Sequence, residues 1–317
     1  MKRLALALVL CMVAAEACAQ PYPAKPMRLV VPFPAGGIAD LYGRLIGNRI
    51  AEAWGQPVVV ENRTGAGGNI GADVVAKAAP DGYTLLMGSI GTHAVNVSLF
   101  SKLPYDPVRD FAPISLVLEA EGLLVVHPSI AAQNVSELIQ LAKARPLSFA
   151  SAGMGTASHL AGELFKSMAK IEMTHVPYKG NVPAITDLLA GQTSLLFATM
   201  PTVLPHARAG KLRALATIGS ARSAAAPELP TVAESGLPEF DVTNWIGLFA
   251  PEGTPQEIVR RWNAEATRFL QSPEIQARLV AEGARAVATT PEQFGAFVKA
   301  EIAKWAPVVK ASGARVD

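Results

Sequence analysis

The stretch MRLVVPFPAGGIADLYGRLIGNRIAEAWG, residues 27–55, holds a short apolar run, a glycine-containing loop and a helical pattern in direct succession. Residues 27–31 are mostly apolar and rich in β-branched side chains, which predicts a strand. Apolar side chains recur at helical spacing through residues 41–54, and Gly55 is placed to stop that helix. This succession of strand, loop and helix is the unit from which α/β folds are built.

Similar apolar runs recur along the chain. They span residues 58–61, 83–87, 123–127, 147–151, 193–198 and 212–218. Near-continuous apolar strands indicate burial on both faces, as in a parallel sheet that is covered by helices. Towards the C-terminus, the motifs TPQE (residues 254–257) and TPEQ (residues 290–293) predict helix starts with proline at the first helical position. We therefore expect an α/β fold with a helical C-terminal region that lacks strong strands.

The order of these elements predicts two lobes. Residues 123–241 contain a complete set of strands and helices, whereas the segments on either side need each other to build a sheet. We expect a discontinuous first lobe of residues 20–122 and 242–317, and a second lobe of residues 123–241. In such folds, ligands bind beyond the carboxyl ends of the strands and between the lobes.

The composition excludes several classes of protein. Half of the 317 residues are apolar and 17% are charged, which excludes a disordered chain. The net charge of +2 is too small for a nucleic-acid partner. The five histidines show no metal-ligand spacing, and the two cysteines, Cys11 and Cys18, provide neither a disulfide scaffold nor a zinc module. We therefore expect no metal and no cofactor.

The N-terminus has the pattern of a signal peptide. Two basic residues precede an apolar run over residues 4–15, and small side chains stand at Ala17 and Ala19. This predicts a signal peptide of residues 1–19 that is cut after Ala19, so that a protein without cysteine reaches the periplasm. A membrane anchor would need a longer run than Glu16 permits. Acylation of Cys18 as a lipoprotein is the other alternative.

Two glycine-containing loops are candidates for binding an anion. In residues 31–40, Gly36 and Gly37 allow backbone N–H groups to approach a ligand at the start of the following helix, which suits a carboxylate. Asp40 is either the N-cap of that helix or an acceptor for a ligand. In residues 151–159, the hydroxyl groups of Ser151 and Thr156 suit a second carboxylate. An ordinary tight connection is the alternative for the first loop.

Other interpretations of these loops are weaker. Residues 151–159 lack the third glycine of a dinucleotide-binding loop, because Ser158 stands in its place. His159 could contact a ligand, act as a base or be a buried structural imidazole. A nucleophile elbow around Ser89 would need glycine at position 87, where the chain has Met87. A secreted hydrolase that uses Ser89 or Ser151 with a histidine is therefore a minor alternative, and we expect no enzyme.

The chain resembles the Bug-type receptors, the extracytoplasmic solute-binding proteins of tripartite tricarboxylate transporters. The similarity follows the chain in order and covers essentially all of it after the leader. The similar stretches are residues 22–37 with Asp40, 58–63, 65–68, 80–86, 103–107, 151–159, 175–180 and 210–216. Ile38 and Ala39 stand where the family varies, so the side-chain preference of the ligand does not transfer.

The resemblance implies a type II periplasmic-binding-protein fold, with two α/β lobes that are joined by crossover strands and close on a small carboxylate. It implies that the carboxylate lies between residues 33–40 and 151–159, with residues 89–93 and Tyr178 as wall elements. The expected ligand-binding residues are Phe33, Ala35, Gly36, Gly37, Asp40, Ser89, Thr92, Ser151, Gly153, Gly155, Thr156, His159 and Tyr178.

These features lead to one main functional expectation. We expect a monomeric periplasmic receptor that delivers a carboxylate to the membrane permease subunits of a tripartite tricarboxylate transporter. A periplasmic protein of the same fold that reports its ligand to a membrane signalling partner is the alternative, and the sequence does not separate the two. The identity of the carboxylate also does not follow from the sequence.

Overall fold

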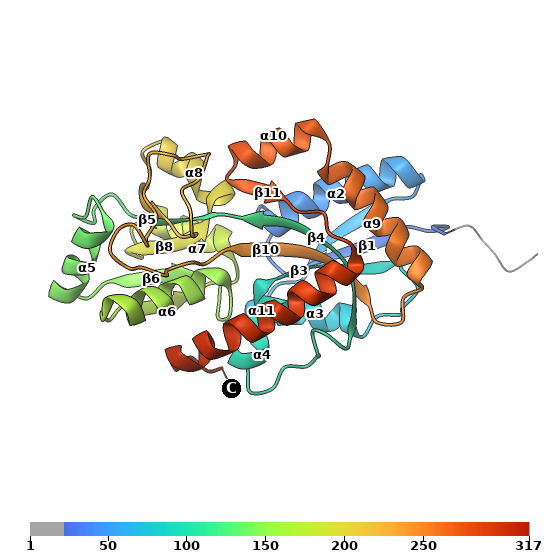
Figure 1. Ribbon diagram of the computed structural model, residues 1–317, viewed down its shortest axis with the longest axis horizontal. Coiled ribbons are helices and arrows are strands. Elements are labelled where there is room, and N and C mark those ends of the chain that lie inside the picture. Colours follow the sequence, from blue (N-terminus) through green and yellow to red (C-terminus); the bar gives the residue numbers. More distant parts are fainter. Residues whose placement is uncertain (1–21, 317) are drawn as a thin grey trace, which may run out of the picture.

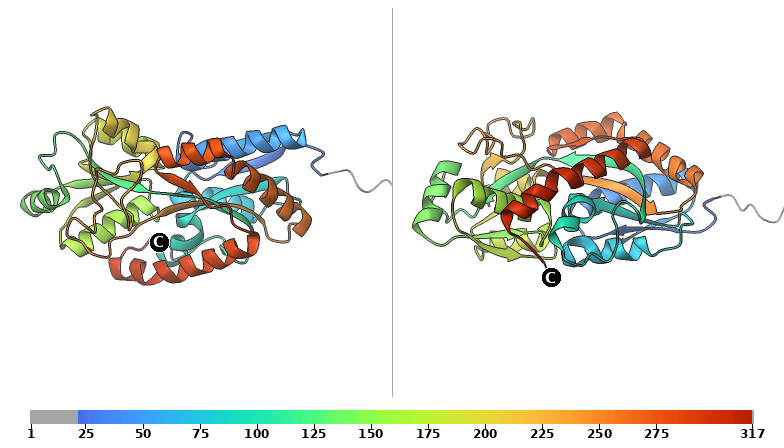
Figure 2. Two further views of the ribbon diagram at one scale, coloured as in Figure 1. Left: turned by 45° about the horizontal axis from the view of Figure 1, so that its top comes forward. Right: turned by 60° about the horizontal axis from the view of Figure 1, so that its bottom comes forward.

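The structure is a computed structural model that describes residues 22–316 (Figure 1). The expected cleavage after Ala19 and both cysteines lie outside the described residues. Two sheets form two lobes at opposite ends of an elongated molecule, as Figures 1 and 2 show. This confirms the expected α/β fold with two lobes. Within residues 22–316, no helix is both long and apolar enough to cross a membrane.

Lobe 1 is built on a six-stranded sheet in the order β11-β4-β10-β3-β1-β2. Its strands are β1 (Met27–Val31), β2 (Val58–Asn62), β3 (Thr84–Ser89), β4 (Phe111–Ala120), β10 (Asn244–Pro251) and β11 (Ala284–Ala286). Its α-helices are α2 (Ile38–Trp54), α3 (Asn69–Ala76), α4 (Asn96–Leu99), α9 (Gln256–Leu270), α10 (Pro273–Ala281) and α11 (Pro291–Ser312). A short 3-10 helix, η1 (Ala66–Gly68), and a short π-helix, η2 (Gly91–Val95), precede α3 and α4. The first strand therefore runs into the helix that residues 27–55 predict.

Lobe 2 is built on a five-stranded sheet in the order β7-β6-β8-β5-β9. Its strands are β5 (Gly122–Val126), β6 (Ser148–Ser151), β7 (Thr174–Pro177), β8 (Leu195–Thr199) and β9 (Arg213–Thr217). Its helices are α5 (Val135–Ala144), α6 (Ala157–Ala169), α7 (Asn181–Leu189) and α8 (Met200–Arg208). Strands β5 and β8 are fully buried, as continuous apolar runs predict.

The lobes are joined by two crossings that run side by side through the middle of the molecule (Figure 1). The chain passes from β4 to β5 through Glu121, and it returns into β10 at Asn244, which pairs with Ala120. Strands β4 and β10 are antiparallel along their whole length. The expected limits of the second lobe, residues 123–241, stay a prediction.

The structure corrects four expectations of strand content and capping. β4, β7 and β10 are strands that the sequence patterns do not indicate, and β10 and β5 run antiparallel to their neighbours. The C-terminal region holds the short strand β11 against β4. Pro255 is the N-cap of α9 rather than its first residue, since its ψ of 133° is not helical, and the Thr254 hydroxyl donates to the carbonyl of Pro251. Thr290, in contrast, forms a complete capping box with Gln293.

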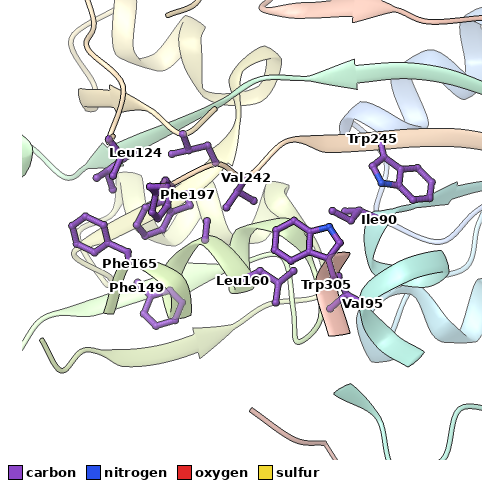
Figure 3. Close-up of a cluster of buried hydrophobic side chains, with 14 of the residues drawn as sticks. Ile90, Val95, Leu124, Phe149, Leu160, Phe165, Phe197, Val242, Trp245 and Trp305 are labelled. Carbon is purple, nitrogen blue, oxygen red and sulfur yellow. The ribbon is translucent and has the colours of Figure 1, made fainter. Parts of the chain in front are cut away.

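A buried cluster extends from lobe 2 to the crossing strands. Figure 3 shows Phe149 and Phe165 in lobe 2 and, further along, Trp245 and Trp305. The indole N–H groups of both tryptophans donate to the same carboxylate oxygen of Glu301, at 2.9 and 3.0 Å. Because Trp245 lies on β10 and Trp305 on α11, this carboxylate fixes the C-terminal helix to a crossing strand.

Candidate functional site

A cavity with a volume of about 60 Å³ lies between the lobes, which is several times the roughly 10–15 Å³ that one water requires. It is bounded by the first turns of helices in both lobes and by the crossing strands. From lobe 1 it is lined by Phe33, Pro34, Gly37, Ile38, Ala39, Ser89, Ile90, Gly91, Ala120, Asn244 and Ile246, and from lobe 2 with its exit loop by Gly122, Ala152, Thr156, Ala157, Ser158, Asn181, Val182, Phe197, Ala198, Thr199, Ile218 and Val242.

Four helix N-termini meet at this cavity. The N-caps of α2, α6, α7 and α8 are Gly37, Thr156, Gly180 and Thr199, and none of them has a side-chain capping bond. The first N–H groups of a helix have no partner within the helix, and the helix dipole adds partial positive charge at this end. The first-turn residues of α2, α6 and α7 that line the cavity therefore present N–H donors suited to an anion, whereas in α8 the Met200 N–H is bonded to the carbonyl of Glu121.

No charged side chain lines the cavity within residues 22–316. Its polar lining consists of the hydroxyl and amide side chains of Ser89, Thr156, Ser158, Asn181, Thr199 and Asn244. The side-chain nitrogen of Asn181 donates to the Thr199 hydroxyl at 3.4 Å, and its buried amide oxygen has no partner among the described residues. Uncharged donors and acceptors are thus available for a small polar ligand.

Asp40 forms hydrogen bonds with the first loop and does not line the cavity. Its carboxylate accepts the N–H of Gly36 at 2.9 Å, accepts the side-chain nitrogen of Asn62 at 2.9 Å and pairs with Arg44. Burial alone would raise the pKa of this carboxyl, but the hydrogen bonds from Arg44, Gly36 and Asn62 outweigh it and lower the pKa. The N-cap of α2 is Gly37, so Asp40 is not the N-cap of this helix, and its contact with a ligand stays a prediction.

Polar side chains of the second loop bond within the loop or to histidines behind it. Ser151 is fully buried, and its hydroxyl lies 2.6 Å from Nε2 of His175. The N–H of Gly155 donates to Nδ1 of His159 at 3.3 Å, and the Thr156 hydroxyl donates to the carbonyl of Gly153 at 2.7 Å. These bonds fix the backbone that leads into α6. Because Ser151 is buried, its contact with His175 does not present a nucleophile to the cavity.

The two histidines behind this loop form a stack. The rings of His159 and His175 are 4.5 Å apart, and His175 also stacks on Phe149 at 4.7 Å. Burial lowers the pKa of both imidazoles to about 4, so both are neutral at pH 7. Of the three roles open for His159, the structure shows a buried imidazole outside the cavity lining.

This depressed pKa predicts a loss of stability in mild acid. Between pH 6.5 and about 4 the unfolded chain binds a proton at His159 that the folded chain does not, so the free energy of unfolding falls as the pH falls. From pH 7 to pH 5, His159 alone is expected to contribute a loss of about 2 kcal/mol. Urea unfolding at both pH values measures the loss, and His159→Gln should make it smaller. Equal unfolding free energies of the wild type at pH 7 and pH 5 would contradict this expectation.

The last residue of β3, Ser89, lines the cavity, and Thr92 and His93 of the following η2 are buried behind it. The Thr92 hydroxyl accepts the N–H of Ser89 at 2.9 Å and lies 2.8 Å from Nδ1 of His93. His93 stacks on Phe249 at 3.8 Å, and burial lowers its pKa to about 3. Thr92 and His93 therefore hold the turn that presents Ser89.

The structure brings some of the predicted binding residues together at the cavity. Phe33, Gly37, Ser89 and Thr156 line it. The remaining ones, which do not line it, are Ala35, Gly36, Asp40, Thr92, Ser151, Gly153, Gly155, His159 and Tyr178. Tyr178 instead donates to Asp187 at 2.6 Å and borders a second, adjoining pocket together with Gly153. Ligand contact by any of these residues stays a prediction.

Sequence reasoning missed Asn181, Thr199 and Asn244 in the cavity lining. For two of them a signal was present: Gly180 precedes the helix that Asn181 begins, and Pro201 marks the helix that Thr199 caps. Asn244 begins a crossing strand, and its neighbours carry no local signal for a binding role.

The lobes contact each other closely around the cavity. A Cβ added at Gly67 of lobe 1 would lie 2.3 Å from the carbonyl oxygen of Met154 in lobe 2, and one added at Gly180 would lie 2.3 Å from Cδ of Pro34. A Cβ added at Gly91 of lobe 1 would likewise lie 3.0 Å from the carbonyl oxygen of Gly155 in lobe 2. Backbone therefore contacts backbone between the lobes, so the structure represents a closed arrangement.

No potential metal site is found among residues 22–316, since no three histidine, cysteine or acidic side chains group together there. Comparisons with known proteins identify the family to which the chain is similar. The family described as "Tripartite tricarboxylate transporter family receptor" matches residues 43–314 of the chain. Protein BugT of Bordetella pertussis is 41% identical over 307 residues, a match that covers 96% of this chain and 94% of BugT.

Two solved structures are similar to this chain over more than nine-tenths of its length. A structure described as R. palustris Rpa4515 with adipate has a TM-score of 0.91 and 38% identity, covering 93% of this chain and all of that one. MatC from Rhodopseudomonas palustris with bound malate has a TM-score of 0.86 and 37% identity, covering 91% of this chain and all of that one.

Proposed function

Because this chain belongs to the tripartite tricarboxylate transporter receptor family, a family of solute-binding receptors, we propose that it captures a small carboxylate in the cavity between its lobes. The observation that carries this proposal is the meeting of four helix N-termini at a cavity without charged side chains. The ends of α2, α6 and α7 offer N–H donors without a helical partner, whereas at α8 the Met200 N–H is bonded to the carbonyl of Glu121 and Pro201 has no N–H, so α8 contributes only the partial positive charge of its dipole. A carboxylate offers two acceptor oxygens with a full negative charge.

Donors from both lobes reach the same ligand in this proposal. The carboxylate accepts hydrogen bonds from first-turn N–H groups of α2 in lobe 1 and α6 in lobe 2, and the hydroxyl of Ser89 is a further donor. A ligand that bridges the lobes binds the closed arrangement better than an open one, so binding shifts the population towards closure. The closed form is then the state that a membrane partner recognises.

The related proteins support the proposed ligand class and the proposed role in a tripartite transporter. Rpa4515 was solved with adipate and MatC with malate, and both ligands are small carboxylates. We extend this class to the present chain, together with the permease subunits of a tripartite transporter as its membrane partner. The leader of residues 1–19, cut after Ala19, would deliver the monomeric receptor to the periplasm.

A thermal-shift panel tests carboxylate capture directly. The chain from Gln20 onward is melted with mono-, di- and tricarboxylates and aromatic acids, and with neutral sugars and amines as controls. A ligand at one hundred times its Kd stabilises the folded state by about 2.7 kcal/mol, so a binding carboxylate should raise the Tm by several degrees. If no carboxylate shifts the Tm at millimolar concentration, the proposed ligand class is wrong.

A further inference from the structure

Asn96, the first residue of α4 in lobe 1, lies at the contact between the lobes and outside the lining of the cavity. Its side chain is fully buried, and the side-chain nitrogen donates to Oδ1 of Asn69 at 2.6 Å and to the carbonyl of Gly67 at 3.4 Å. Asn69 also accepts the Tyr105 hydroxyl at 2.9 Å. All of these partners belong to lobe 1, so they hold Asn96 in place whether or not the lobes are closed.

The amide oxygen of Asn96 faces lobe 2 and has no hydrogen-bond partner among the described residues. A Cβ added at Gly155 would lie 1.9 Å from this oxygen, so an α hydrogen of Gly155 points at it. The N–H groups of Gly155 and Thr156 donate within their own loop instead, to Nδ1 of His159 and to the carbonyl of Gly153, both at 3.3 Å. Closure therefore covers the oxygen with a C–H group, which is a much weaker donor than an N–H group.

This contact destabilises the closed form relative to an open form. When lobe 2 withdraws Gly155, water can hydrate the oxygen, whereas closure buries it without a strong hydrogen bond. A ligand does not remove this cost, because Asn96 does not line the cavity. In this respect Asn96 differs from Asn181, which also has an unpartnered amide oxygen but lines the cavity.

We propose that Asn96 sets the affinity of the receptor by keeping the unliganded lobes open. The inference rests on the proposed function in assuming that the lobes open to admit a ligand. When only a fraction of the unliganded protein is closed, the apparent Kd is the Kd of the closed form divided by that fraction. Asn96 therefore weakens binding without touching the ligand. It also disfavours an empty closed receptor, which would present to the membrane partner the state that signals a bound ligand.

Paramagnetic relaxation measures the closed fraction in the protein without ligand. Both cysteines of the sequence precede Gln20, so a nitroxide on Lys179→Cys labels the chain from Gln20 onward at a single site. Lys179 is exposed in lobe 2, and it borders the same pocket as Gly65 of lobe 1. The relaxation enhancement at the Gly65 amide falls steeply with the distance from the label, so in a mostly open protein it increases in proportion to the closed fraction.

Asn96→Ala removes the buried oxygen and should raise the closed fraction. We expect the relaxation enhancement at Gly65 to increase at least about fivefold, as the cost of an unsatisfied buried acceptor implies. The lost bond to Asn69 exists in the open and closed forms alike, so it lowers the unfolding free energy without opposing closure. A role that is only structural would instead leave the enhancement unchanged or lower it.

Tyr105→Phe is the matched control. It removes a hydroxyl from the same buried network, where Tyr105 donates to Asn69 and to the carbonyl of Thr92, and it keeps the Asn96 oxygen against Gly155. Urea unfolding should show a loss of stability in Tyr105→Phe, and the relaxation enhancement at Gly65 should stay at the value of the protein with Asn96 and Tyr105.

A second variant covers the case in which Asn96→Ala does not fold by circular dichroism. Asn96→Ser also lacks the amide oxygen and should raise the enhancement in the same direction. An enhancement that is unchanged or lower in the folded Asn96 variant, or equally raised in Tyr105→Phe, would overturn the inference. A strong enhancement in the unliganded protein with Asn96 would overturn it too, since the lobes would then already be closed. No carboxylate enters these measurements, so their failure is distinguishable from a failure of carboxylate capture in the thermal-shift panel.

Discussion

Gly37→Val is expected to abolish carboxylate-induced stabilisation and to leave the unliganded protein almost as stable as the wild type. Gly37 is the N-cap of α2 and lines the cavity, so a valine side chain would crowd the free N–H groups of the first turn. The backbone tolerates the change: φ is −76°, and the nearest atom to an added Cβ is the Pro34 oxygen at 3.5 Å. We expect affinity to fall at least about 100-fold, equivalent to about 3 kcal/mol.

Calorimetry on the variant measures the affinity, and urea unfolding measures the stability. The unfolding free energy should change by no more than about 1 kcal/mol, because no packed group is displaced. Gly219→Val is the control, since an added Cβ at Gly219 has no neighbour within 4 Å and this glycine does not line the cavity. Wild-type affinity in Gly37→Val would refute the role of the first loop.

Gly67→Ala is expected to weaken binding by preventing complete closure. Gly67 has φ of 64°, and its added Cβ would lie 2.3 Å from the backbone oxygen of Met154 across the interface between the lobes. Heavy atoms do not approach this closely, so the lobes must separate or the loop must move. If the closed population falls to about 1% of its wild-type value, the apparent affinity falls about 100-fold. Small-angle scattering of the liganded variant should show a larger radius of gyration than the liganded wild type.

A second glycine provides the control that distinguishes the effect of backbone strain at Gly67 from the effect of the steric clash between the lobes. Gly210 has φ of 69°, almost the same conformation, but an added Cβ there meets nothing within 4 Å. Gly210→Ala should therefore show the stability cost of a left-handed alanine, about 1 kcal/mol, with unchanged affinity. Equal affinity losses in Gly67→Ala and Gly210→Ala would exclude a steric block of closure.

Features with a local physical cause were predictable from the sequence. Strand β1, the loop that follows it and helix α2 appear where the pattern of residues 27–55 places them, because side-chain spacing and glycine act within a few residues. The capping box at Thr290 forms for the same reason. The first loop reaches the cavity through Phe33 and Gly37, as expected for a loop between a strand end and a helix start.

Features that depend on distant partners were not predictable in this way. β4 and β10 are antiparallel partners that are separated by more than one hundred residues along the chain. No local pattern of apolar side chains in the sequence therefore indicates that these two strands pair. The sequence also did not show that the Asp40 carboxylate pairs with Arg44 and accepts a hydrogen bond from Asn62, because Asn62 comes from another strand. His159 likewise has its environment set by His175, which arrives from β7.

The sequence by itself determined the α/β class, the strand-to-helix loops and the family of the chain, because glycine geometry, capping and apolar spacing are encoded over short distances. Only the tertiary structure decided which loop residues line the cavity, because closure brings together helix ends from separate lobes. It also placed Asn181, Thr199 and Asn244 beside them and turned Ser151 and His159 into supports for the loop. A binding surface that two lobes share depends on how the lobes pack against each other. This packing results from many weak contacts between residues that are far apart in the chain.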